Sequence, residues 1–297
     1  MLPAPKQFAF QHPGLDRGEH IRESNETLDQ LWPQANIIIV DLQGNARFHD
    51  DSPELAFLSG NDLFVLRPAC TSYLGQADDQ HWFALRAESI EQVPLHAIDL
   101  RTAAASWPHL QASIFAQARA LLYWQERNHF CGACGNALTL VRGGFMAKCE
   151  SCGSEHYPRT DAAVIMAVTD GEKILLGRQA GWPENRWSVL AGFLEPGESL
   201  EQTVIREVFE EAGVRVDRAE YAASQPWPFP ASLMLGFHAY AKPQEAKAGD
   251  ELEQAQWFSA AQLRDGIASG TIGISPRLSI SRWLIEEWCA RMGVSLS

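Results

Sequence analysis

Three glutamates in the second half of the chain have the spacing of a metal-binding group. On a helix, Glu207, Glu210 and Glu211 would occupy a sector about 100° wide beside an apolar face. Like charges at this spacing repel one another, and partial burial makes each carboxylate costlier. A divalent cation such as Mg²⁺ or Mn²⁺ relieves both costs, and such ions suit phosphate chemistry. A solvent-exposed acidic face is the alternative interpretation.

The flanking residues predict the helix that carries these glutamates. Ser199 can cap its N-terminus, and Gly213 can end it just after the last turn. The acidic residues Glu198 and Glu201 suit the positive end of the helix dipole. Arg206 lies beside the glutamates and could orient one carboxylate through a bidentate pair. The predicted apolar face consists of Val204, Ile205, Val208 and Ala212.

Four of the six cysteines form two CxxC pairs. The first pair is Cys131 and Cys134, and the second is Cys149 and Cys152. Two such pairs can direct four thiolates toward one tetrahedral zinc ion. Disulfides, which a reducing compartment disfavours, and a redox CxxC, which needs no second pair, are the alternatives. Since the protein would supply all four ligands, we expect one structural Zn²⁺ per chain.

The hydrophobic pattern divides the chain into three predicted regions of an α+β protein. Residues 1–127 form an α/β-type N-terminal domain without a catalytic motif, and a helix is predicted at its end, over 108–127. Residues 128–156 contain the zinc ribbon, and residues 157–290 form the C-terminal domain. The main predicted strands are 37–40, 63–66, 82–85, 162–168, 174–176 and 187–190.

The composition excludes several classes of partner. The 297 residues include 24 Lys and Arg against 37 Asp and Glu, a net charge of −13. Such a chain is a poor nonspecific ligand for nucleic acid or an anionic membrane. No apolar run approaches the roughly 20 residues that span a bilayer, and the N-terminus lacks the pattern of a secretory signal. We therefore expect a cytoplasmic protein without a membrane partner.

The glutamate-rich segment as a whole resembles the Nudix box. Residues 192–214 read GFLEPGESLEQTVIREVFEEAGV. The matching positions are Gly192, Glu198, Arg206, Glu207, Val208, Glu210, Glu211, Gly213 and Val214. The resemblance implies a Nudix α/β/α sandwich and hydrolysis of nucleoside diphosphates linked to another group. It also implies that Glu207 and Glu211 bind metal, and that Glu210 is a further ligand or aligns the attacking water. Glu198 and Arg206 would hold the loop.

A proline-rich motif follows the box. Residues 224–234 read SQPWPFPASLM, and the alternating prolines fix an extended backbone that would hold Trp227 and Phe229 ready to stack on flat heterocycles. A surface loop or an SH3 ligand is the alternative. The motif resembles the substrate-selecting motif of the NADH pyrophosphatase subfamily of Nudix hydrolases. That subfamily also hydrolyses the NAD cap of RNA, and it carries a four-cysteine ribbon directly before the Nudix domain.

The subfamily resemblance implies the remaining site residues. Tyr157 would stack on the substrate base, while the Ala191 carbonyl and Glu251 would help to bind two or three Mg²⁺ or Mn²⁺ ions. Ser281 stands where the family often has an alanine that contacts the substrate, so it is an implied substrate-binding residue. Residues 142–145 (RGGF) replace a stretch that can present a glutamate in family members. The other implied substrate-binding residues are Gln225, Pro226, Trp227, Pro228, Phe229, Pro230, Ala231 and Ser232.

These observations together predict a metal-dependent hydrolase that cleaves NAD(H) into nicotinamide mononucleotide and AMP. NAD-capped RNA is a further expected substrate, and a homodimer is implied by the resemblance alone. One alternative is a Nudix hydrolase that prefers ADP-ribose or dinucleoside polyphosphates. The other is a non-catalytic Nudix protein that senses nucleotides, although none of the box carboxylates is lost.

Overall fold

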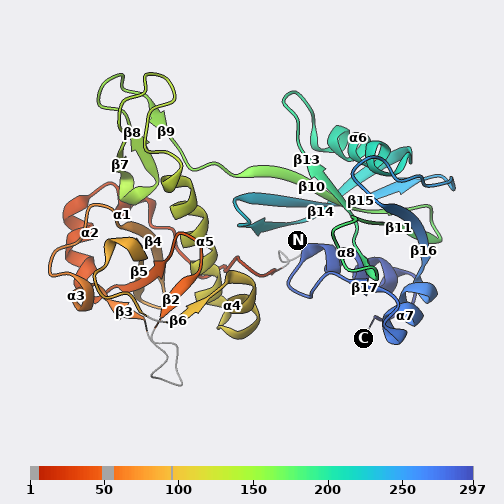
Figure 1. The fold of residues 1–297 in the computed structure, drawn as a ribbon, viewed down its shortest axis with the longest axis horizontal. Helices are drawn as coiled ribbons and strands as arrows, with labels where there is room; N and C mark the ends of the chain where they lie inside the picture. Colours follow the sequence, from red (N-terminus) through yellow and green to blue (C-terminus); the bar gives the residue numbers. More distant parts are fainter. Residues whose placement is uncertain (1–6, 49–56, 95, 297) are drawn as a thin grey trace. The chain divides into compact units, whose positions relative to one another are not determined.

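The computed structural model describes residues 7–48, 57–94 and 96–296 (Figure 1). The chain divides into two compact units. One comprises Met1–Phe8, Asp161–Trp227 and Ser232–Ser297, and the other comprises Ala9–Thr160 and Pro228–Ala231. None of the described helices has the length and apolar character needed to cross a membrane.

The unit that contains the N-terminal region is built on a six-stranded sheet of order β4-β5-β1-β2-β6, with β3 paired to β1. Strands β1 and β5 are parallel, and the other pairs are antiparallel. The strands are β1 (Asn36–Val40), β2 (Ala46–Phe48), β3 (Leu58–Ser59), β4 (Ser72–Ala77), β5 (Gln80–Arg86) and β6 (His96–Ile98). The helices are α1 (Glu19–Arg22), α2 (Asn25–Leu31), α3 (Gly60–Leu63), α4 (Leu100–Ser106) and α5 (His109–Glu126).

Most predicted elements of this unit are present, and one is wrong. The predicted strands at 37–40 and 82–85 lie within β1 and β5, and the predicted helix at 108–127 is α5, with Pro108 at its N-cap. The expected strand at 63–66 does not form. Ser59 and Asp62 make a capping box that starts the short helix α3, and beyond its end Val65 and Leu66 are exposed.

The same unit holds the cysteine pairs on a small sheet of three strands. These are β7 (Thr139–Val141), β8 (Met146–Lys148) and β9 (Glu155–His156), paired in that order. A reverse turn within each cysteine pair is closed by a backbone hydrogen bond, from Gly135 N to Cys131 O at 2.8 Å and from Gly153 N to Cys149 O at 2.9 Å. Both glycines adopt a positive φ, which glycine tolerates without strain.

The other unit contains a mixed sheet of order β14-β15-β10-β11-β16, with β13 paired to β10. Strands β10 and β15 run parallel from Asp161↔Ser232 to Thr169↔Tyr240. The strands are β10 (Asp161–Thr169), β11 (Lys173–Arg178), β12 (Arg186–Trp187), β13 (Leu190–Phe193), β14 (Val216–Trp227), β15 (Ser232–Ala241), β16 (Gln254–Ser259) and β17 (Gly273–Ile274). The helices are α6 (Leu200–Ala212), α7 (Ala260–Ser269) and α8 (Ile280–Arg291).

The predicted strand at 187–190 is interrupted in this unit. Trp187 ends β12, which pairs with β17, and Leu190 begins β13, which pairs with β10. Between them, Ser188 forms an isolated bridge with Gly177. Three different pairing partners therefore divide a run that reads as one strand in the sequence.

Helices cover both faces of this mixed sheet (Figure 1). Alternate side chains of β10 point to opposite faces. Val164 and Met166 pack with Val204 and Val208 of α6, whereas Ile165 and Ala167 belong to the core that contains α7 and α8. The predicted α/β/α sandwich is confirmed, and the box helix α6 forms one of its outer layers.

Candidate active site and zinc site

Helix α6 begins and ends at the residues that the sequence predicts. The Ser199 hydroxyl accepts a hydrogen bond from Gln202 N. The Gln202 side-chain oxygen in turn accepts one from Ser199 N, which completes a capping box. Gly213 follows the last turn with a φ of 66°. The predicted apolar face is right except for Ile205, which is 42% exposed. Ile205 lies at the edge of the apolar face of α6, where its side chain is exposed to solvent.

Arg206 connects the loop before α6 to two glutamates of the helix. Its guanidinium donates to both carboxylate oxygens of Glu198, at 2.7 and 2.9 Å, and to the Phe193 carbonyl at 2.9 Å. It also donates to Glu207 and Glu210, each at 2.9 Å. Hydrogen bonds from Arg206 lower the pKa of Glu198 to about 2. Arg206 and Glu198 therefore link the loop before α6 to the helix.

Glu207 packs directly against the backbone of β13. A Cβ atom added to Gly192 would lie 1.8 Å from the Glu207 carboxyl carbon, so only glycine leaves space for this carboxylate. Burial raises the pKa of Glu207, and the charges of Glu210 and Glu251 act in the same direction. Arg206 opposes the shift.

Glu211 is the most buried acid of the box, with 6% exposure. Burial, followed by the charges of Glu207 and Glu251, raises its pKa to about 8, against a hydrogen bond from the Ala191 backbone that lowers it. Its Oε2 atom is buried and has no hydrogen-bond partner. A buried carboxylate oxygen without a partner is costly unless something absent from the protein chain completes the site.

The carboxylates of this group are of the kind that bind a divalent cation. Glu207, Glu211 and Glu251 act on one another electrostatically, and each offers hard oxygen ligands of the type that Mg²⁺ and Mn²⁺ prefer. A cation would neutralise the repulsion that raises the two pKa values, and it would satisfy Glu211 Oε2. Glu210 is more exposed and is held by Arg206, so its carboxylate remains accessible to solvent.

The four cysteine sulfurs form a second metal-binding group. Their ligand atoms all lie within 4.8 Å of one another, with Cys131 and Cys152 sulfurs at 3.6 Å and Cys134 and Cys149 sulfurs at 3.5 Å. Zinc–sulfur bonds of about 2.3 Å in a tetrahedron place sulfurs roughly 3.8 Å apart. None of the four is in a disulfide. One structural Zn²⁺ therefore fits, with no coordination position left for substrate.

The proline-rich motif is divided between the two compact units. Gln225, Pro226 and Trp227 end β14, Ser232 begins β15, and the turn Pro228–Ala231 groups with the N-terminal sheet. The predicted extended backbone is present up to Trp227 and ends at the turn. Gln225 is fully buried, where its amide donates to Leu278 O and its oxygen accepts from Ile280 N, both at 2.7 Å.

The two remaining residues that the sequence assigns to substrate binding differ in exposure. Tyr157 is 54% exposed, so its side chain is open to solvent. Its hydroxyl donates a hydrogen bond to Glu155 at 2.6 Å. Ser281 is buried, and its hydroxyl contacts those of Ser188 at 2.9 Å and Ser275 at 3.2 Å. The serine cluster has no motif in the sequence, because its members come from three separate segments.

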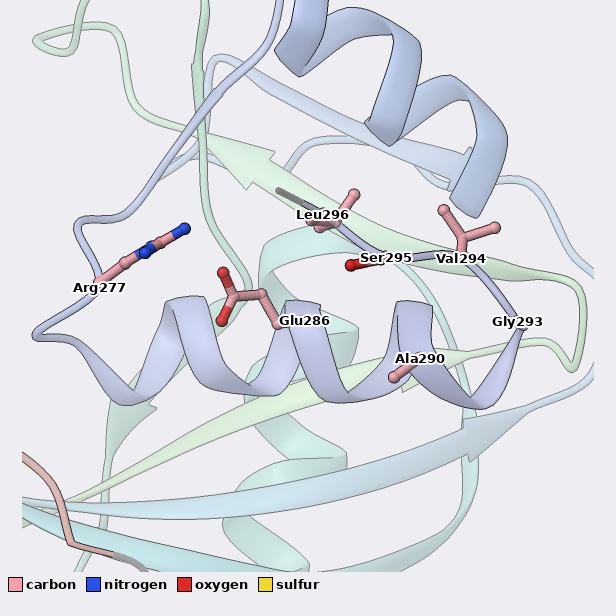
Figure 2. A pocket seen from close by; sticks show the side chains of 7 residues that line it. All are labelled: Arg277, Glu286, Ala290, Gly293, Val294, Ser295 and Leu296. Atoms are coloured by element: carbon pink, nitrogen blue, oxygen red, sulfur yellow. The ribbon is translucent and has the colours of Figure 1, made fainter.

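A hollow that the sequence does not predict lies beside α8 (Figure 2). It measures about 790 Å³ and is bounded by α8 and by the C-terminal residues 293–296. Arg277 and Glu286 supply its charged groups, while Val294 and Leu296 supply apolar surface. It contains none of the residues that the sequence assigns to a site.

The sandwich and its glutamate-rich loop and helix define a Nudix domain, and comparison with known families agrees. The NUDIX domain model matches residues 158–278. The NADH pyrophosphatase zinc ribbon domain matches 126–157, and the NADH pyrophosphatase-like rudimentary NUDIX domain matches 36–124. The chain belongs to the NADH pyrophosphatase subfamily of Nudix hydrolases.

The similar proteins cover between about half and nearly all of the chain. A protein named NAD-capped RNA hydrolase NudC from Mycobacterium bovis is 34% identical over 293 residues, which is 93% of each chain. The human NAD-capped RNA hydrolase NUDT12 is 43% identical over 192 residues, or 60% of this chain and 42% of its own. A crystal structure of a Nudix hydrolase from Nitrosomonas europaea covers 56% of this chain and 94% of its own, with 24% identity and a TM-score of 0.46.

Proposed function

We propose that this chain is a metal-dependent diphosphatase that cleaves NAD(H) into nicotinamide mononucleotide and AMP and also removes NAD caps from RNA. The observation that carries the proposal is the buried Glu211 carboxylate beside Glu207 and Glu251, with an oxygen that no protein group satisfies. The names of the Mycobacterium and human relatives support NAD-capped RNA as a substrate. The net charge of −13 favours recognition of the cap over recognition of the RNA backbone.

The metal site consists of Glu207, Glu211, Glu251 and the Ala191 carbonyl. Two or three Mg²⁺ or Mn²⁺ ions held there would neutralise the diphosphate and make its phosphorus more electrophilic. Arg206 holds Glu207 in orientation through its 2.9 Å hydrogen bond. We assign alignment of the attacking water to Glu210. The water oxygen bonds to one phosphorus as the bridging P–O bond breaks, so one of the two product phosphates carries the new oxygen.

The substrate-binding residues form two groups. Tyr157 and Trp227 carry rings that suit stacking on the bases, and the Phe229 ring, which Arg101 covers, would line the wall beside them. Gln225 and Ser281 are buried, and their side chains are hydrogen-bonded within the protein. They therefore shape the wall of the proposed substrate site and do not offer polar groups to the substrate. Pro226, Pro228, Pro230, Ala231 and Ser232 complete the proposed wall.

The wider organisation is part of the same proposal. We propose an N-terminal domain at 1–127, a zinc ribbon at 128–156 and a Nudix domain at 157–290. The active form is a homodimer located in the cytoplasm. These assignments rest on the sequence pattern and on membership of the subfamily.

A parallel assay tests the proposed substrate. The full chain is incubated with NADH, NAD⁺, ADP-ribose or a dinucleoside polyphosphate, each with Mg²⁺ and with Mn²⁺, and the products are quantified by chromatography. We expect NADH or NAD⁺ to have the highest kcat/KM. A preference for ADP-ribose or the polyphosphate would refute the substrate assignment. Nucleotide binding without turnover would support a sensor instead.

A further inference from the structure

The turn of the proline-rich motif is held by arginines of the N-terminal region. Pro228–Ala231 belongs to the same compact unit as the N-terminal sheet, although the strands that it connects belong to the other unit. Nothing in the turn's own sequence explains this grouping. The contacts that hold it come from α4, from α5 and from Phe10.

The guanidinium of Arg119, on α5, contacts both the backbone of the turn and the aromatic ring of Phe229. Its Nη1 donates to the Pro228 carbonyl, and its guanidinium lies 5.0 Å from the centre of the Phe229 ring. Arg101 of α4 lies closer to the same ring, at 3.8 Å. The Phe10 ring adds an edge-on contact with Phe229 at 5.6 Å. An arginine over an aromatic face is attracted to the electrons of the ring, and more strongly where water is excluded.

The N-terminal region is shaped to hold Arg119 in this position. Arg119 Nε donates to the Gly44 carbonyl at 3.2 Å. A Cβ atom on Gly44 would lie 2.7 Å from the same nitrogen, so the absence of a side chain there gives the guanidinium its place. Gly44 has a φ of 81°, and Asp41 shapes its loop by accepting from Asn45 N at 2.8 Å.

Two arginines close to one aromatic ring would be unfavourable without a reason to gather there. Burial and the charge of Arg101 both lower the pKa of Arg119, which reflects the cost of the arrangement. The Pro228 and Gly44 carbonyls and the Phe229 ring offset part of this cost. The arrangement therefore adds arginine contacts to a turn whose flanking residues, Trp227 and Ser232, already pair in the sheet.

We propose that Arg119, supported by Gly44 and Arg101, is a positioning residue that fixes the substrate-selecting turn at Pro228–Ala231. The inference rests on the proposed function, because that function gives the turn its role in binding substrate. It assigns Arg119 a part in substrate binding, exerted through the turn. Loss of Arg119 should weaken NADH binding, while the carboxylates of the Nudix box, which perform the chemistry, remain in place.

Substitution of Arg119 tests this role. In the full chain with Mn²⁺, Arg119→Ala should raise KM for NADH by about tenfold and change kcat by less than about twofold. Hydrogen–deuterium exchange should increase at the amides of Phe229, Ala231 and Ser232. Arg119→Lys should recover part of the KM loss, because lysine can still donate to the Pro228 carbonyl. The matched control is Arg127→Ala, since Arg127 follows the same helix and covers Tyr123 instead, at 4.1 Å.

The outcomes separate the inference from the proposed function. If wild-type protein does not hydrolyse NADH, the proposed function is wrong and the inference falls with it. If wild-type protein is active and Arg119→Ala keeps its KM and its exchange pattern, the inference alone is wrong. A loss of kcat with unchanged KM would also contradict it. Should Arg119→Ala fail to fold, Arg101→Ala removes the closer ring contact and must raise KM in the same way.

Discussion

Gly192 and Glu207 occupy adjoining space so closely that no side chain fits between them. A Cβ atom at Gly192 would lie 1.8 Å from the Glu207 carboxyl carbon and 2.1 and 2.2 Å from its two oxygens. The glycine of strand β13 therefore sets the place of a carboxylate on helix α6. This contact explains in steric terms why the box begins with glycine.

Gly192→Ala should displace Glu207 and impair metal binding. We expect kcat/KM for NADH to fall by about 100-fold, because small displacements of catalytic groups carry costs of this size. The matched control is Gly181→Ala, where an added Cβ meets no atom within 4 Å. Steady-state kinetics and a Mn²⁺ titration check the prediction. Normal activity in Gly192→Ala would show that the Glu207 position is not required.

Glu211→Gln should abolish turnover and preserve the fold. The neutral amide cannot replace an anionic oxygen ligand, so we expect a loss of at least about 10³-fold in kcat, the order of magnitude for loss of a central electrostatic group. Glu201→Gln, on the exposed first turn of α6, is the control. Residual activity near the wild-type level would remove Glu211 from the metal site.

The same substitution should change how stability depends on pH. The pKa of Glu211 is raised from 4.5 to about 8 in the folded chain, so wild-type stability falls as pH rises between these values. The Gln variant lacks this fall. Without added Mg²⁺ or Mn²⁺, the stability of the variant relative to wild type should increase by about 2 kcal/mol from pH 6 to pH 8. Urea unfolding at both pH values measures the difference, and an unchanged difference would contradict the raised pKa.

Arg206→Lys should reduce activity although it keeps the positive charge. The guanidinium contacts Glu198, Glu207 and Glu210 at once, which an ammonium on a flexible stem cannot reproduce. We expect kcat to fall by about tenfold or more. Arg264→Lys provides the control, because Arg264 is exposed and pairs with Asp265 on α7. Equal kcat values for Arg206→Lys and Arg264→Lys would show that the simultaneous contacts of the Arg206 guanidinium are not needed for activity.

Loss of zinc should unfold the ribbon. Cys149 is fully buried, and Cys149→Ser should eliminate bound zinc and lower the melting temperature by about 5 °C or more. Cys70→Ser is the control, since Cys70 is exposed and lies outside the cluster. Elemental analysis should find one zinc per wild-type chain. Full zinc content in Cys149→Ser would refute the four-cysteine site.

The features that the sequence predicts correctly depend on short-range rules. Ser199 and Gly213 define the ends of α6 because capping is a local interaction. The two CxxC pairs predict the sulfur cluster because each pair forms its own turn. The expected strand at 63–66 failed for a local reason too, since the Ser59–Asp62 capping box outweighs the apolar run that follows it.

Features that depend on distant contacts could not be predicted. Gln225 stands in a substrate motif, yet its amide is bonded to Leu278 and Ile280, more than 50 positions away. The contact of the Ser281 hydroxyl with that of Ser188 spans 93 positions. The contact of Arg119 with Pro228 spans 109 positions and has no signature in the pattern of residue types.

Product analysis of NADH cleavage tests the central claim most directly. The full chain is incubated with NADH and Mn²⁺ in ¹⁸O-labelled water, with Glu211→Gln as the inactive control, and the products are identified by mass spectrometry. We expect equal amounts of reduced nicotinamide mononucleotide and AMP, with one ¹⁸O atom in the phosphate of one product. Release of nicotinamide with ADP-ribose, or equal product from the Glu211→Gln chain, would contradict it.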